Sequence, residues 1–294
     1  MTVAVERPLI RAMPAVFVLI WATGFIVARY GMPHAPPLKF LVLRYTFSIV
    51  CFLAWITLAK VKWPTQPRQW LHLSLTGMLM HAGYLGGVWS AVKLGMGSGL
   101  SSLIVGLQPV LTALWLASTG YRIVPRQWAG LVLGFIGLVL VVSRKFGSGG
   151  EANVLNLALI MGALLSITAG TLYQKRFVTA CDVRSANTVQ LLAALLVSLP
   201  FALSETEAID WHPELVGALA WSVLGLTLGG SSLLYLLIQK GAAASVTSLM
   251  YLVPPVTALM AWVLFAEPIT AITLGGTLLT AVGVALVVRQ TVRP

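Results

Sequence analysis

Residues 106–114 read GLQPVLTAL, and residues 252–260 read LVPPVTALM. Both stretches lie inside long apolar runs, where a proline removes a helical hydrogen bond and its ring clashes with the preceding turn. Pro109 and Pro255 stand 146 positions apart, almost half of a chain of 294 residues. The sequence therefore has a helix-breaking residue at matching positions of two halves.

The composition excludes an ordinary soluble domain. The chain is 58% hydrophobic and only 9% charged, whereas soluble domains carry about 25% charged residues. Apolar windows of about 20 residues are long enough to cross a hydrocarbon core, where only helices and closed barrels satisfy the backbone. We predict an all-α polytopic membrane protein with ten transmembrane helices, over residues 12–30, 38–59, 70–92, 98–119, 125–143, 154–175, 184–203, 214–236, 244–265 and 270–289.

The charged residues follow the loops between these windows. One set of loops holds thirteen basic residues and two acids, and the opposite set holds five basic residues and six acids. Because basic loops stay in the cytoplasm, both termini are expected there, in a multi-pass protein of the cell inner membrane. The net charge of +11 is thus explained by topology, and no nucleic acid partner is expected.

The chain repeats itself at an offset of 146 residues. Residues 93–142 align without gaps to residues 239–288, pairing Pro109 with Pro255, Gly130 with Gly276 and Gly137 with Gly283. Fixed-period similarity indicates a repeated structural unit. We therefore divide the chain into a first half, residues 1–146, and a second half, residues 147–294.

The two halves are predicted to be inverted relative to each other. Each holds five spans, an odd number, and matched loops carry opposite charge: Lys60, Lys62 and Arg68 in one correspond to acids of the 204–213 segment in the other. Inverted repeats are typical of secondary transporters, with the substrate near the bilayer midplane where the repeats meet. An internal repeat also suits alternating access better than a channel, which usually takes its lining from oligomeric symmetry.

The matched prolines are candidates for a hinge or gate. A broken membrane helix is tolerated where neighbours or a cavity satisfy the freed carbonyls, so Pro109, Pro254 and Pro255 are expected beside the pathway. The alternative is that they are harmless, as single prolines in membrane helices often are. Gln108 is expected to bond carbonyls freed by the break, with contact to the solute as the alternative.

These features resemble the drug/metabolite transporter superfamily, in its EamA-type, ten-helix branch. The resemblance covers the whole chain and rests on the duplication, on PVLTALW and PPVTALM, and on GLVLGFIGLVLVV at 130–142 with GTLLTAVGVALVV at 276–288. The chain is similar in particular to bacterial YddG-type exporters of aromatic amino acids, since WATGFIVARYG at 21–31 resembles their first helix. The resemblance implies that amino acids, aromatic ones above all, are exported.

Charge inside the spans is restricted to one residue. No Asp or Glu lies in the interior of a predicted span, which argues against the proton-coupled export of organic cations. Arg44 is the exception, and a charge at that depth indicates function by default. It is expected to hold a substrate carboxylate or to make a cavity positive; the alternative is a side chain that snorkels to the outer interface.

Polar and aromatic side chains within the spans are the candidate solute contacts. His81, Tyr84 and Val88 share one helix face, beside a small-residue seam formed by Gly83 and Gly87. His81 is also the candidate proton sensor, whereas ordinary helix packing is the alternative for it and for the aromatic residues. The predicted contacts are Trp21, His81, Tyr84, Tyr173, Ser231, Ser248 and Tyr251.

Other chemistries find no support in the motifs. The four histidines are scattered without metal-ligand spacing, so no metal or cofactor is expected, and Cys51 and Cys181 fall in different environments. GMGSG at 95–99 lacks the first glycine of an intramembrane protease turn. We expect no enzyme activity.

The sequence thus predicts a secondary transporter that exports amino acids or related small amphiphilic metabolites by alternating access. The alternative within the same superfamily is an exchanger of nucleotide sugars or phosphorylated metabolites. Such solutes would call for several Lys or Arg residues in the cavity, whereas Arg44 is a single one. The expected partners are the solute and the lipid bilayer, and the protein is expected to be monomeric.

Overall fold

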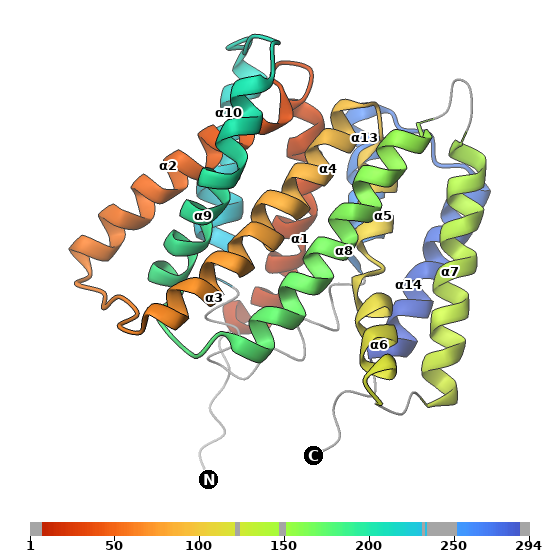
Figure 1. Ribbon diagram of the computed structural model, residues 1–294. Coiled ribbons are helices and arrows are strands. Elements are labelled where there is room, and N and C mark those ends of the chain that lie inside the picture. Colours follow the sequence, from red (N-terminus) through yellow and green to blue (C-terminus); the bar gives the residue numbers. More distant parts are fainter. Residues whose placement is uncertain (1–7, 121–123, 147–150, 231–232, 234–251, 289–294) are drawn as a thin grey trace.

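The computed structural model describes residues 8–120, 124–146, 151–230, 233 and 252–288, which form a bundle of helices (Figure 1). No strand occurs among these residues, apart from an isolated bridge between Phe146 and Ala152. The helices of the first half are α1 (Pro8–Gly31), α2 (Pro37–Leu58), α3 (Pro67–Gly77), the π-helix η1 (Met78–Gly83), α4 (Tyr84–Lys93), α5 (Ser98–Val105), α6 (Gln108–Ser118) and α7 (Pro125–Lys145). Those of the second half are α8 (Val154–Phe177), α9 (Val183–Ser204), α10 (Pro213–Trp221), the π-helix η2 (Ser222–Gly230), α13 (Val253–Phe265) and α14 (Ala271–Val288).

Prolines and glycines set several of these bounds. α2, α3, α7 and α10 each begin at a proline, where the missing N–H would have had no helical partner in any case. Gly95 and Gly120 follow α4 and α6 with φ of 92° and 93°, a left-handed conformation that glycine adopts without strain. The 95–97 loop before α5 is thus the connection that the sequence predicts.

Six of the described helical segments are long and apolar enough to cross a membrane. They are 37–58, 98–118, 125–145, 154–177, 183–204 and 213–230. Large apolar side chains point outward from several of them: Trp115, Phe135, Leu196 and Leu203 are each at least 60% exposed. This confirms an all-helical protein with several membrane-length helices, while the count of ten spans stays a prediction.

The helix bounds repeat at the offset found in the sequence. Adding 146 to the bounds of α1 gives 154–177, the bounds of α8, and adding it to α2 gives 183–204, the bounds of α9. α3 and α10 begin at positions related by the same offset, as do α7 and α14. The local structure of the two halves therefore matches almost residue by residue.

Irregular turns also fall at matching places. The π-helix η1 covers 78–83, and its counterpart positions, 224–229, lie within the π-helix η2. Single π turns within helices are frequent at functional sites. A second break separates α5 from α6 at residues 106–107, directly before the Gln108–Pro109 pair, as the first quoted stretch predicts.

Helices of one half pair with helices of the other. α7 packs against α14, α2 against α9, α5 against α13, α4 against α8, and α1 against α10 and η2. At the 146-residue offset, the contacts of α1 with α10 and η2 correspond to those of α8 with α3 and η1, while the α7–α14 and α2–α9 pairs each correspond to themselves. The core also includes contacts within one half, such as Phe40 of α2 stacked on Trp89 of α4 at 4.4 Å.

The α7–α14 pair is joined by small residues. A Cβ placed on Gly137 would lie 2.5 Å from the carbonyl oxygen of Gly276, and one placed on Gly130 would lie 2.5 Å from that of Gly283. The earlier glycine of α7, Gly130, thus meets the later glycine of α14, Gly283, while Gly137 meets Gly276. The two helices therefore run antiparallel. Such close backbone contact requires residues without side chains at the crossing.

Candidate functional site

The charged residues gather at the two ends of the bundle. Hydrogen bonds among the α1–α2, α4–α5, α9–α10 and α13–α14 loops and helix ends place them together, at the top of Figure 1. We call this the acidic end, and it holds Glu151, Glu205, Glu207, Asp210, Glu214 and Glu267. The opposite, basic end includes Lys60, Lys62, Arg68, Arg126, Lys175, Arg176 and Arg184, with Asp182.

Among the described residues, Arg44 is the charged residue that lies between these two ends. Its side chain contacts a helix of the second half. Its side chain is buried, and its Nε and Nη2 donate to Thr227 Oγ1 at 3.3 and 3.2 Å. At 1.5 Å per residue, Arg44 lies about 10 Å and Thr227 about 21 Å from the acidic-end starts of their helices, within a hydrocarbon core of about 30 Å. The guanidinium thus bonds to a neighbouring helix instead of snorkelling to the interface.

A second polar contact crosses between the halves in the reverse direction. The side chain of Gln190, on α9, interacts with the side chain of His81, on η1. Gln190 is the 146-residue counterpart of Arg44, and Thr227 is that of His81. The two contacts are therefore one contact repeated by the internal symmetry, each joining a helix of one half to the π-helix of the other.

Tyr45 and Tyr84 complete the surroundings of these pairs. The hydroxyl of Tyr45 donates to the carbonyl oxygen of His81 at 2.9 Å, and the two rings meet edge to face at 6.3 Å. Tyr84 is 7% exposed, and the charge of Arg44 acts on both tyrosines and on His81. Of the predicted contacts, His81, Tyr84 and Arg44 are brought together, and we call them, with Tyr45, Gln190 and Thr227, the central cluster.

Charge within a membrane helix is costly, by about 2.5–3.5 kcal/mol on insertion scales. Arg44 has no carboxylate to offset this cost, since every described acidic residue lies in or beside a loop. An electropositive, hydroxyl-lined position between two halves can attract an anionic group. The central cluster is therefore the candidate site.

Other predicted residues lie in separate environments. The Trp21 ring packs on Phe17 of the same helix at 5.5 Å. Tyr173 Oη lies 2.8 Å from Nδ1 of His72, and Phe177 packs on both rings at 4.7 and 5.4 Å. The partner of Tyr173 was not predicted, since nothing in the local pattern links His72 to a helix about a hundred residues further on. Ser231, Ser248 and Tyr251 lie outside the described residues.

The prolines predicted to break helices lie at helix starts in the structure. Pro109 lies in the first turn of α6, and Pro254 and Pro255 lie in the first turn of α13. The amide of Gln108 donates to Thr171 Oγ1 at 2.9 Å. The hydroxyl of Thr171 on α8 is thus one partner of this amide, and a bond from Gln108 to a carbonyl freed by the break stays a prediction. The Thr171 contact ties the break to the second half.

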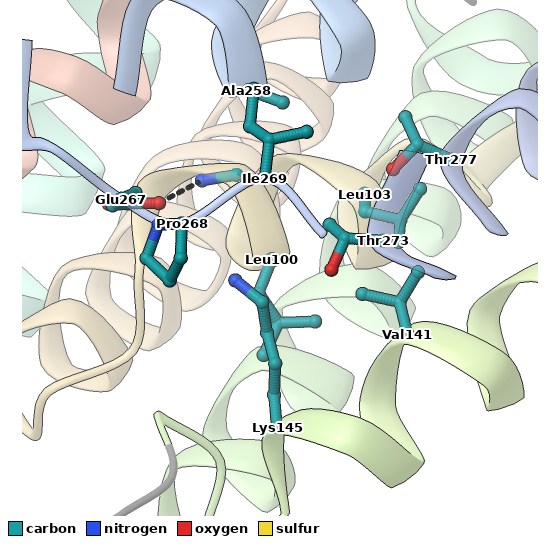
Figure 2. Close-up of a pocket in the computed structure, with 11 residues that line it drawn as sticks. Leu100, Leu103, Val141, Lys145, Ala258, Glu267, Pro268, Ile269, Thr273 and Thr277 are labelled. Atoms are coloured by element: carbon teal, nitrogen blue, oxygen red, sulfur yellow. Dashed lines mark hydrogen bonds between the residues drawn. The ribbon is translucent and has the colours of Figure 1, made fainter. Parts of the chain in front are cut away.

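At the acidic end, carboxylates of the second half bond helix starts of the first. Glu205 accepts from the backbone N–H groups of Leu38 and Lys39 at 3.0 and 2.8 Å. Glu267 accepts from those of Ser98 and Gly99 at 3.0 and 3.3 Å (Figure 2). A carboxylate at a helix N-terminus satisfies unpaired N–H groups and opposes the positive end of the helix dipole. These contacts join the two halves at the acidic end.

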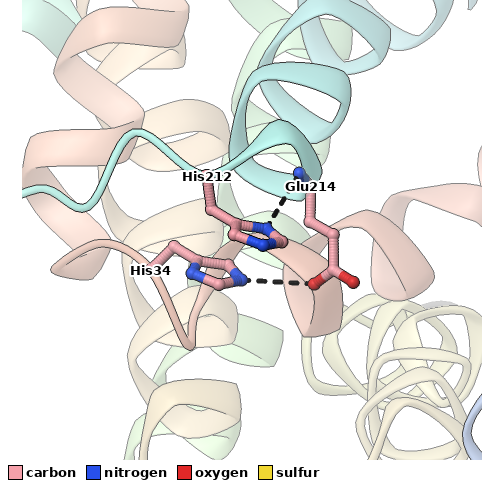
Figure 3. Close-up of side chains that lie close together, drawn as sticks. All are labelled: His34, His212 and Glu214. Atoms are coloured by element: carbon pink, nitrogen blue, oxygen red, sulfur yellow. Dashed lines mark hydrogen bonds and ion pairs between the residues drawn. The ribbon is translucent and has the colours of Figure 1, made fainter.

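Two histidines predicted to be scattered meet at this end (Figure 3). The ring nitrogens of His34 lie 3.1 Å from Asp210 Oδ2 and 3.2 Å from Glu214 Oε2, and these two carboxylates raise the pKa of His34. The His212 ring stacks on His34 at 4.4 Å and 6°. The nitrogen lone pairs of parallel rings do not converge, so the cluster is not shaped for a metal ion despite its short spacings.

Two of the cavities lined by described residues lie away from the predicted solute contacts. The first, between α5, α7 and the α13–α14 loop, has a volume of about 20 Å³ (Figure 2), room for one water molecule. The second, of about 490 Å³, is an open groove at the basic end, lined by residues of the α2–α3 and α8–α9 loops such as Trp63, Gln69 and Cys181. Gln69 crosses this groove to the backbone of Thr179 at 2.7 Å.

The fold and the central cluster define a helical membrane protein with a polar contact between two matching halves. The chain belongs to the EamA-like transporter family, whose description matches residues 12–143 and 155–289 separately. This confirms the resemblance to the drug/metabolite transporter superfamily.

Relatives along nearly the whole chain are named as transporters. A "Probable amino-acid metabolite efflux pump" of Salmonella typhimurium is 28% identical, covering 90% of each chain. The "Uncharacterized inner membrane transporter YedA" of Escherichia coli strain K12 is 27% identical, covering 91% of this chain and 82% of that protein. An "Uncharacterized transporter" of Archaeoglobus fulgidus is 22% identical, covering 94% and 97%. A crystal structure with 20% identity and a TM-score of 0.67, covering 94% of this chain, has the same fold.

Proposed function

We propose that this protein exports amino acids, aromatic ones or related small amphiphilic metabolites, across the bacterial inner membrane by alternating access. The observation that carries the proposal is the pair of exchanged contacts, Arg44 with Thr227 and Gln190 with His81. Each joins the two halves near mid-depth, where transporters built from inverted repeats bind their substrates. The amino-acid efflux name of a 28% identical relative agrees with the solute class.

The proposed architecture is ten transmembrane helices in two inverted five-helix units, residues 1–146 and 147–294, with both termini cytoplasmic. The repeated helix bounds, the antiparallel glycine contacts of α7 with α14 and the two separate family matches support it. The acidic end then faces away from the cytoplasm, because basic loops are retained inside.

In the proposed mechanism, the solute lies beside the central cluster and the halves rock around it. The hydrogen bonds at the acidic end, such as those of Glu205 and Glu267, close one side. The breaks beside Pro109 and Pro255 let the helix ends move when that side opens. Because no acid lies within the spans to carry protons, we propose facilitated diffusion or exchange.

The test is uptake of labelled tryptophan, phenylalanine and threonine into liposomes that contain the purified protein, with and without a proton gradient. We expect saturable uptake without a gradient, reduced by unlabelled amino acids, and none in protein-free liposomes. If none of the three enters, the amino-acid proposal is wrong, and exchange of phosphorylated metabolites becomes the reaction to test. Uptake that requires the gradient would contradict facilitated diffusion alone.

A further inference from the structure

Arg44 has hydrogen-bonding capacity that the described residues do not use. A guanidinium carries five N–H donors in one plane. Two of its nitrogens, Nε and Nη2, donate to a single oxygen, Thr227 Oγ1, and this is the one acceptor found for the side chain among the described residues. The remaining donors have no acceptor among the described residues, so they are available to a ligand.

Two buried hydroxyls beside this contact are also unpaired. Ser48 lies one helical turn beyond Arg44 on α2, and Ser222 begins η2, where its carbonyl oxygen accepts from Thr227 Oγ1 at 2.8 Å. Both serines are 0% exposed, and neither Oγ has a hydrogen-bond partner in the part of the chain that the structure describes. Buried polar atoms without partners are rare in native proteins, so two of them beside a buried cation indicate a missing ligand.

The symmetry-related position lacks these features. Gln190 replaces Arg44 there and interacts with His81, and Ala194 replaces Ser48. A neutral contact is thus sufficient to join α9 to the π-helix η1, although the counterpart of Ser222, Thr76, also carries a hydroxyl. The charge and the extra hydroxyl on the α2 side are consequently not required by packing.

We propose that Arg44 and Thr227, with the hydroxyls of Ser48 and Ser222, bind the carboxylate of the exported solute. This deepens the proposed function and rests on it. A carboxylate accepts two parallel hydrogen bonds from a guanidinium, and its single negative charge neutralises the single positive charge of the site. A phosphate monoester carries nearly two negative charges at neutral pH, which one Arg44 does not balance.

The experiment compares each amino acid with its own amide, which differs only in lacking the carboxylate. Proteoliposomes take up whichever of labelled tryptophan, phenylalanine or threonine the wild type transports, and the unlabelled acid and amide compete. We expect the wild type to prefer the acid by about tenfold or more, as for a hydrogen bond to a charged group. Arg44→Gln is expected to reduce this preference to near unity, and Arg44→Lys to keep part of it.

Matched variants separate binding from folding. Gln69→Ala removes a polar contact at the basic end, outside the central cluster, and is expected to keep the preference for the acid. Thr227→Val removes one hydroxyl at constant volume and is expected to weaken the preference, whereas Thr227→Ser restores it. If Arg44→Gln lowers the yield of folded protein, the two Thr227 substitutions test whether this site binds the carboxylate.

The possible outcomes distinguish failure of the proposed carboxylate site from failure of the proposed amino-acid export. Absence of wild-type uptake of all three amino acids overturns the proposed function. Uptake with equal competition by acid and amide, or an Arg44→Gln variant that still prefers the acid, overturns the carboxylate site and leaves amino-acid transport standing. Stronger competition by inorganic phosphate or glucose 1-phosphate than by the amino acid also overturns it.

Discussion

His34 connects the short turn after α1 to the α9–α10 loop, and its bonds depend on protonation. One ring nitrogen lies beside Asp210 and the other beside Glu214, so only the imidazolium donates to both carboxylates at once. The carboxylates raise the pKa of His34 above its ordinary value of 6.5. A raised histidine pKa means that the folded, closed form binds the proton more tightly than the unfolded chain.

We therefore predict that His34 stabilises the protein in a pH-dependent way. The melting temperature of the wild type should exceed that of His34→Gln most below pH 6.5, and the difference should disappear as the pH rises through the raised pKa. This difference in melting temperature is expected to be small. The side chains of Asp210 and Glu214 are 72% and 50% exposed, and solvent screens such ion pairs. Melting curves in detergent between pH 5.5 and 8.5 measure it.

Neighbouring groups define the control for this prediction. His212 stacks on His34 and its Nδ1 accepts from the backbone N–H of Glu214 at 3.3 Å, so His212→Gln removes the stacking while the two carboxylates of His34 remain. Lys93, paired with Glu207, is the nearby cation of α4. A stability difference that grows with rising pH would contradict the assignment to His34.

At the scale of the elements, α7 and α14 meet in close backbone contact. A Cβ at Gly276 would lie 2.6 Å from Val141 Cγ2 and 2.7 Å from the carbonyl oxygen of Gly137, whereas one at the adjacent Gly275 would meet nothing within 4 Å. Both glycines lie in the same helix, so a substitution at either one changes helix propensity alike. Only a substitution at Gly276 also disturbs the packing against α7.

We predict that Gly276→Leu destabilises the protein and that Gly275→Leu does not. Overpacking at a tight contact costs about 1–3 kcal/mol, which should lower the melting temperature and the yield of monodisperse protein. Size-exclusion chromatography and thermal melting in detergent measure both. Equal loss in the two variants would show that the antiparallel contact is not as close as described.

The helix breaks carry a different prediction, about motion. Pro109 and Pro255 lie in first turns, where a proline costs little, so Pro109→Ala with Pro255→Ala should leave the melting temperature nearly unchanged. If the breaks are hinges, uptake should slow several-fold, because substitutions at hinges alter the rates of gated steps. An unchanged uptake rate in the double variant would make the hinge hypothesis wrong.

At the scale of the whole molecule, the orientation in the membrane can be tested with a native cysteine. Cys181 lies in the basic-end groove, where its Sγ accepts from the Gln69 amide at 3.7 Å, and Cys51 lies within α2. If the basic end is cytoplasmic, a membrane-impermeant maleimide should label Cys181 in inside-out vesicles and leave it unlabelled in intact cells. Labelling is done at mildly alkaline pH, since partial burial raises the pKa of the Cys181 thiol and the thiolate is the reactive form.

The control is Cys181→Ser, which should lose the signal while Cys51 remains. Strong labelling of Cys181 in intact cells would reverse the predicted orientation. It would also place the acidic end and its His34 contacts in the cytoplasm, and the pH effect would then respond to cytoplasmic acidity.

The sequence by itself determined the helical membrane class, the family, and most helix bounds. These follow from local signals, above all hydropathy over about 20 residues, which predicted windows 154–175 and 184–203 where α8 and α9 span 154–177 and 183–204. Arg44, His81 and Tyr84 were each identified as candidates, because charge and polarity within a span are visible without a structure.

Only the tertiary structure decided which side chains meet. The offset relates Arg44 to Gln190 and His81 to Thr227, but it does not reveal that the contacts are exchanged, Arg44 with Thr227 and Gln190 with His81. The partners of Arg44 and His34 lie 183 and 176 residues away, and local pattern carries no information at that separation. These contacts arise because helices of one half pack against helices of the other, which depends on the complementary surfaces of the whole bundle.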